Sequence, residues 1–81
     1  MADQHDETLE SLAGIWAGIL GIKNVGAEDN FFAKGGHSLL AVKLIEQVQK
    51  KFGVELELSD LYEYPTLGEF SEHLKSLSSV S

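Results

Sequence analysis

The residue of this chain best suited to covalent chemistry is Ser38, which follows the run Gly35-Gly36-His37. Two glycines let the backbone turn tightly and leave space beside the serine hydroxyl. Apolar residues recur at helical spacing after Ser38, so we expect a helix to begin there. The free backbone N–H groups and the positive dipole end of a helix start favour a phosphate. The position therefore suits a serine that carries a phosphodiester.

Other sites and chemistries fit the sequence less well. A loop followed by an ordinary N-cap serine is the simplest alternative for Ser38. A serine hydrolase needs a base and a carboxylate, but the ring of the adjacent His37 diverges from the Ser38 hydroxyl at a helix start. Glu69 and His73 lie one helical turn apart without a third metal ligand, which favours a surface ion pair. We expect no catalytic residues and no metal site.

The element before Ser38 is a long loop that follows a first helix. Periodicity predicts this helix over about Glu7–Leu20, and its interior glycines, Gly14 and Gly18, suggest close packing against another element. Residues 21–37 show no period, and loops of this length are often functional. The apolar residues expected to pin the loop to the core are Ile22, Val25, Phe31 and Phe32.

The element that begins at Ser38 is an amphipathic helix. It should span Ser38–Phe52 and end at Gly53. Its inward stripe consists of Ala41, Leu44, Ile45, Val48 and Phe52. Residues 54–58 alternate apolar and polar side chains as a strand would, but the sequence offers no second strand to pair with them. We therefore expect an extended link here, with its apolar side chains turned inward.

Two further helices complete the predicted fold. Ser59 or Asp60 can cap a short third helix that runs through Tyr62 and stops before Pro65. Thr66–Glu69 has the pattern of a capping box and should open the last helix. The sequence thus predicts an all-α bundle of three to four helices with a long first loop and a short third helix.

Composition limits the classes of function. The chain has 81 residues, which is enough for one domain. Its net charge is −7, with six lysines and no arginine, so it lacks the basic surface that a nucleic-acid-binding protein needs. It has no cysteine, and no apolar run approaches the ~18 residues of a membrane span. The acidic N-terminus is unlike a secretory signal. We expect a cytoplasmic domain over residues 7–77, with flexible polar tails at 1–6 and 78–81.

The segment Asp29–Leu40 resembles the carrier signature of nonribosomal peptide synthetases. That signature has an acidic residue, two aromatics, a Leu-Gly-Gly-His-Ser core and then leucine. The resemblance covers nearly the whole chain and includes the Tyr64–Leu67 step into the last helix. It implies a peptidyl carrier protein of the acyl carrier family. In that family the matching serine, here Ser38, is esterified by 4′-phosphopantetheine, which a phosphopantetheinyl transferase donates from coenzyme A.

The same resemblance implies what the protein does and which proteins it meets. The terminal thiol of the arm holds an aminoacyl, peptidyl or acyl group as a thioester, and the chain catalyses nothing itself. The expected partners are an adenylation or acyl-loading enzyme and condensation, ketosynthase or tailoring enzymes. We expect the carrier to be a monomer that binds neither nucleic acid nor a membrane. Candidate docking residues beside Ser38 are His37, Leu39, Leu40 and Val42, although Leu40 also suits core packing.

Some positions separate the possible subclasses. Lys34 stands where the signature usually has leucine, and His37 stands where fatty-acid carriers typically have aspartate. The second helix carries more lysine than glutamate: Lys43, Lys50 and Lys51 against Glu46. These features favour the peptidyl type over a carrier of fatty-acid or polyketide type. A cofactor-free helical adaptor is the rival from another class, but it has no need of a serine exposed behind two glycines.

Overall fold

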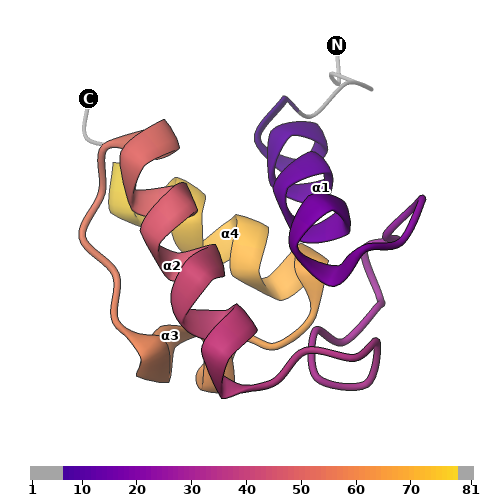
Figure 1. The fold of residues 1–81 in the computed structure, drawn as a ribbon. Coiled ribbons are helices and arrows are strands. Elements are labelled where there is room, and N and C mark those ends of the chain that lie inside the picture. Colours follow the sequence, from indigo (N-terminus) through magenta and orange to yellow (C-terminus); the bar gives the residue numbers. More distant parts are fainter. Residues whose placement is uncertain (1–6, 79–81) are drawn as a thin grey trace, which may run out of the picture.

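The computed structural model describes residues 7–78 and confirms an all-α bundle with a short third helix. Its helices are α1 (Glu7–Leu20), α2 (Ser38–Phe52), α3 (Leu58–Glu63) and α4 (Leu67–Ser78). In Figure 1, α4 passes behind α1 and α2, and α3 lies at the foot of the bundle. Of the expected tails, residues 1–6 and 79–81 lie outside the described part. Within residues 7–78, no helix is long and apolar enough to span a bilayer.

A single core joins all four helices to the long loop. Its fully buried members include Trp16 of α1, Phe31 of the loop, Leu44 of α2, Leu61 of α3 and Phe70 of α4. The Trp16 ring meets the Phe31 ring edge to face, with centroids 5.3 Å apart, and lies 6.2 Å from the Phe70 ring. Such aromatic pairs stabilise a core beyond the area they bury. The segment that leads to Ser38 is therefore part of the core.

The bounds of α1 are as expected, but the role predicted for its glycines is wrong. Leu12 and Trp16 are buried on one face, while Gly14 and Gly18 are exposed. A Cβ atom at either glycine would meet nothing within 4 Å. Two positions along a helix correspond to about 200° of rotation, so these glycines face away from the buried pair. They do not pack closely against another element.

The link after α2 and the start of α3 differ in how well they were predicted. Gly53 ends α2 in the left-handed conformation (φ 67°), and residues 54–57 form the expected extended link. The cap of α3 is neither Ser59 nor Asp60 but Glu57, whose carboxylate accepts from the backbone of Asp60. Asp60 returns a bond to the Glu57 N–H at 2.8 Å. Two carboxylates thus form a capping box whose N-cap, Glu57, lies two residues before the expected Ser59.

The start of α4 lies where it was predicted, directly after Thr66, but only the threonine half of the expected capping box forms. Thr66 Oγ1 accepts a hydrogen bond from the backbone N–H of Glu69 at 3.3 Å. Asn30 in the long loop pairs with Thr66 in an isolated β-bridge. The backbone bonds around this bridge are Phe31 N–H to Pro65 O (2.8 Å), Leu67 N–H to Asp29 O (3.1 Å) and Gly68 N–H to Ala27 O (2.8 Å). The start of α4 therefore holds the loop that leads to Ser38.

Candidate functional site

Ser38 is the first residue of α2 and is exposed. The N-cap is His37, whose backbone is extended (φ −143°, ψ −178°) and whose side chain makes no capping hydrogen bond. The His37 carbonyl accepts from Ala41 N–H at 2.8 Å and so begins the helical ladder. Ser38 is therefore not the capping residue, which removes the simplest alternative for a serine at this place.

The first turn of α2 also differs in charge from those of the other helices. Carboxylates stand in the first turns of α1, α3 and α4, and these residues are Glu7, Glu10, Asp60 and Glu69. The first turn of α2 contains no acidic residue, while Lys50 and Lys51 occupy its last turn. The partial positive charge at a helix start is stabilised by a nearby anion. A phosphodiester on Ser38 would supply that anion.

The two glycines before His37 have different roles. Gly35 has a φ of +107°, a conformation that residues with a side chain rarely adopt. Gly36 lies against the buried Phe31, and its N–H donates to the Phe31 carbonyl at 3.0 Å. A Cβ at Gly36 would lie 2.3 Å from the Phe31 ring, which is closer than atoms can approach. One glycine thus turns the backbone, and the other lets it pass over the core just before Ser38.

Asn30 organises the loop, although its sequence position alone did not single it out. Its Oδ1 accepts from the N–H groups of Phe32 (2.8 Å) and Ala33 (3.1 Å). Asparagine commonly forms such side-chain turns. An asparagine directly before two aromatic residues is the sequence feature that could have indicated this role. Asn30 fixes the turn that places Phe31 in the core and Phe32 beside it.

The expected docking residues lie at the start of α2 with unequal exposure. His37 is exposed, Leu39 is 62% exposed and Val42 is 42% exposed. Leu40 is half-buried and packs against the core, in line with its alternative role. The structure adds Tyr62 on α3, which is 53% exposed although it is large and apolar. Tyr62 does not stand out in the sequence, because a short helix gives little periodicity from which to assign a face.

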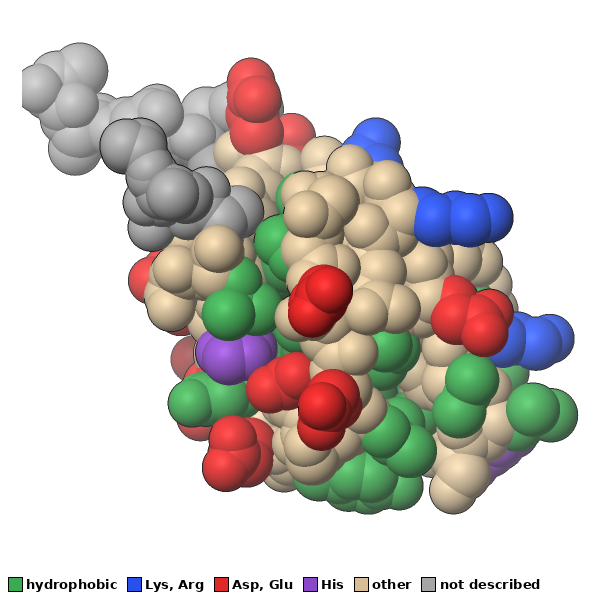
Figure 2. All heavy atoms as spheres, turned by 90° about the vertical axis from the view of Figure 1, so that its left-hand side faces the viewer, with side chains coloured by type: hydrophobic (Ala, Val, Ile, Leu, Met, Phe, Trp, Pro, Cys, Tyr) green, Lys and Arg blue, Asp and Glu red, His purple; other side chains and the backbone are tan. Residues whose placement is uncertain are grey.

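A shallow apolar hollow lies between α2 and α3. Its volume is about 180 Å³, and its lining consists of Val42, Ile45, Glu46, Leu56, Glu57 and Leu58. On the face drawn in Figure 2, hydrophobic side chains gather along the lower edge with acidic side chains beside them. Exposed apolar patches with a polar rim are typical of protein interaction sites.

The remaining chemistry-bearing residues form pairs away from Ser38. Lys34, which departs from the expected signature, forms an ion pair with Asp29 at 3.7 Å. His73 has a different acidic partner from the expected Glu69, since its Nε2 lies 3.1 Å from Asp60 Oδ1. No group of three possible metal-ligating side chains comes together within residues 7–78.

Known proteins match both the sequence and the fold. The family model for the phosphopantetheine attachment site matches residues 10–74. Gramicidin S synthase 2 of Brevibacillus brevis is 42% identical over 76 residues, which are 94% of this chain and 2% of that protein. The chain is therefore similar to a very small part of this relative.

Two solved structures have the same architecture. One is a four-domain nonribosomal peptide synthetase (TM-score 0.88, 37% identity, 96% of this chain and 6% of that chain). The other is a phosphopantetheine transferase in complex with coenzyme A and a peptidyl carrier protein (TM-score 0.85, 33% identity, 94% of this chain and 99% of that chain). The likeness thus extends to the sequence as well as the fold.

Proposed function

Because the chain belongs to the phosphopantetheine attachment-site family and is a carrier domain, we propose that Ser38 is the residue that bears the arm. The main support for this proposal is the position of Ser38. It is an exposed serine in the first turn of α2, and that turn contains no acidic residue. Gly36 supports it, because a larger residue would displace the backbone just before the serine. When attached, the arm supplies a thiol that forms a thioester with the cargo.

The carrier shuttles an aminoacyl, peptidyl or acyl group between biosynthetic enzymes. Its partners are a phosphopantetheinyl transferase, a loading enzyme of the adenylation type and condensation or tailoring enzymes. Support comes from the similarity to a peptidyl carrier protein solved with a transferase and to a peptide synthetase. A cytoplasmic location belongs to the same proposal, because attachment consumes coenzyme A.

The chain itself catalyses no step of this transfer. Carriers of this family generally act as substrates and tethers for other enzymes. A hydrolase would need a histidine and a carboxylate beside the serine. The histidine–carboxylate pair of this chain is His73 and Asp60, and the His73 ring stacks on Tyr64 with ring centroids 4.4 Å apart. This pair makes no contact with Ser38. We expect the transferase to supply the base that removes the Ser38 hydroxyl proton.

Attachment at Ser38 is tested by intact mass. The protein is incubated with coenzyme A and a broad-specificity phosphopantetheinyl transferase, and we expect one added phosphopantetheine. Ser38→Ala should remain unmodified under the same conditions. No added mass on the natural protein, or equal modification of Ser38→Ala, would refute the assignment.

Docking is proposed to use the exposed apolar residues of the first turns of α2. Leu39 is the most exposed of them, and burial of such a side chain against a partner is favourable. Leu39→Asp should lower transfer from a loading enzyme by about tenfold or more while leaving helicity intact, because an interface loses a buried apolar contact and gains a charge. Circular dichroism measures the helicity, and unfolding of this variant would place Leu39 in the core instead.

A further inference from the structure

The short helix α3 needs support from the rest of the molecule. It has only six residues, Leu58–Glu63, and isolated helices of this length are not stable in water. It nevertheless carries the exposed aromatic residue Tyr62, and its Leu58 lines the hollow between α2 and α3. The position of α3 must therefore come from its contacts with other elements.

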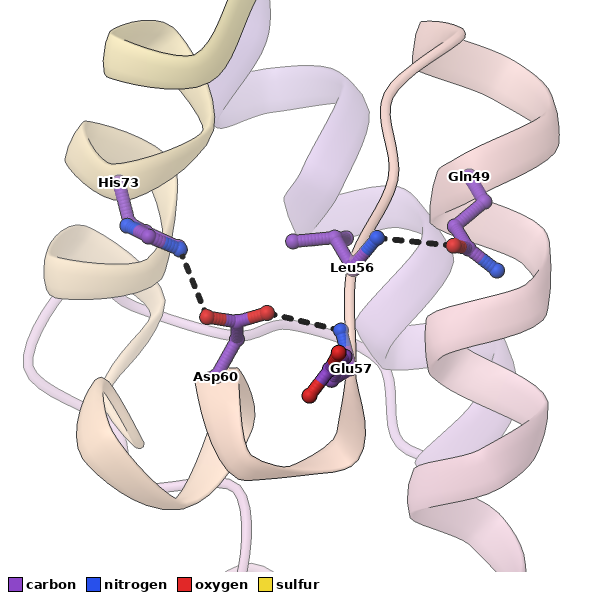
Figure 3. A network of polar contacts seen from close by, with 5 residues as sticks. All are labelled: Gln49, Leu56, Glu57, Asp60 and His73. Atoms are coloured by element: carbon purple, nitrogen blue, oxygen red, sulfur yellow. Dashed lines mark hydrogen bonds and ion pairs between the residues drawn. The ribbon is translucent and has the colours of Figure 1, made fainter.

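Three polar side chains hold α3 and the link before it. Gln49 of α2 accepts from the Leu56 N–H through Oε1 at 2.8 Å. Asp60 uses one carboxylate oxygen for the Glu57 N–H and the other for His73 of α4, as Figure 3 shows. A carboxylate only accepts hydrogen bonds, so the Nε2 of His73 carries the proton. We call Gln49, Asp60 and His73 the polar clamp.

The α4 half of this clamp is shielded from water. The side chains of His73 and Asp60 are only 17% and 24% exposed. The His73 ring stacks on Tyr64, with centroids 4.4 Å apart and planes 20° apart, which fixes its orientation. A hydrogen bond to a charged group contributes more when water is partly excluded. His73 is thus held in a geometry that lets it restrain Asp60.

The helix α3 also contacts the segment that leads to Ser38. The Tyr62 ring stacks on Phe32 with centroids 4.9 Å apart and planes 4° apart. Phe32 in turn meets Phe31 edge to face at 5.4 Å, and Phe31 underlies Gly36. Contacts therefore run without a break from the clamped helix to the loop that ends at Ser38.

We propose that the polar clamp is a positioning device that fixes α3 and the link before it relative to α2 and α4, so that the phosphopantetheinyl transferase meets a preformed surface beside Ser38. Binding to a preformed surface avoids the cost of ordering α3 at the moment of contact. The proposal rests on the proposed function, since it concerns the surface that the transferase and later partners approach. Gln49 and His73 are positioning residues and touch no reacting atom.

The test compares two variants of His73 in attachment by the broad-specificity transferase, with coenzyme A saturating and the carrier varied. His73→Leu introduces an apolar side chain that has no donor for Asp60, whereas His73→Gln retains an N–H group near the position of Nε2. For His73→Leu we expect the KM for the carrier to rise about fivefold with kcat unchanged, because α3 must then be ordered when the transferase binds. His73→Gln should restore the natural KM.

Controls separate the clamp from the fold and from the attachment itself. Glu69→Gln changes an exposed residue one turn earlier on α4 and should leave KM unchanged. A natural KM in His73→Leu, or an equally raised KM in His73→Gln, overturns the proposal. Failure of the natural protein to be modified refutes instead the assignment of Ser38.

Amide hydrogen exchange of the natural protein gives a readout that needs no variant. The Glu57 N–H, bonded to Asp60, should exchange at least about tenfold more slowly than in an unstructured chain. Faster exchange at Glu57 in His73→Leu than in Glu69→Gln supports the clamp. An unprotected Glu57 amide in the natural protein overturns it, whether or not His73→Leu folds.

Discussion

At the scale of single residues, Gly36 shows how strictly the approach to Ser38 is built. A methyl group at this position would lie 2.3 Å from the Phe31 ring and 2.7 Å from the Phe31 carbonyl oxygen. Phe31 is fully buried against Trp16 and has no space to withdraw. Gly36→Ala should therefore lower the free energy of unfolding by about 2 kcal/mol, as overpacked cores do. Urea denaturation followed by circular dichroism measures this change.

Gly26 provides the matched control in the same loop. A Cβ there would lie 3.6 Å from Asp29 Oδ2, which is an ordinary contact. Gly26→Ala should therefore change stability by less than about 0.5 kcal/mol. Equal stability of Gly36→Ala and the natural protein would contradict the steric role assigned to Gly36.

Local structure was predictable where the signal was local. The start of α2 at Ser38 followed from the glycines before it and the apolar periodicity after it, which act within a few positions. The partner of His73 was not predictable, since Asp60 lies thirteen positions away and another carboxylate, Glu69, lies one turn away. Contacts set by the packing of two helices leave no trace in local spacing.

At the scale of elements, two glycines inside α1 lower its stability without a packing role. Gly14 and Gly18 are exposed helix-interior residues with open space around them. Glycine in a helix interior costs about 0.5–1 kcal/mol relative to alanine. Gly14→Ala and Gly18→Ala should each raise the free energy of unfolding by that amount, measured by urea denaturation.

The helix-terminal Gly53 is the control for this prediction. Its left-handed backbone (φ 67°) disfavours any residue with a Cβ, so Gly53→Ala should destabilise although it too has open space. A loss of stability in Gly14→Ala would contradict the prediction and show that the Gly14 face of α1 packs closely against another part of the protein.

Long periodic helices were predicted at their observed bounds, and the short one was not. The sequence marks α1 and α2 by apolar stripes and by a glycine after the last turn. For α3, two plausible capping residues, Ser59 and Asp60, lay inside the helix rather than at its cap. Its start is set by the exchange of hydrogen bonds between Glu57 and Asp60, and carboxylates at both positions are a weak signal in an acidic chain.

At the scale of the whole molecule, loop and helices share one core. Trp16 and Phe31 are buried together, the loop is bonded to the start of α4, and Leu61 brings α3 to the same cluster. The segment that leads to Ser38 is thus anchored to the same core as the helices.

This shared core predicts that the chain unfolds as one unit. Trp16 is the single tryptophan and is fully buried where α1, the loop and α4 meet, so its fluorescence reports on that junction. Its urea midpoint should coincide with that of helical circular dichroism, as for small two-state domains. The midpoint should also be independent of protein concentration, as for a monomer. An earlier fluorescence transition would show instead that the Trp16 junction separates before the helices melt.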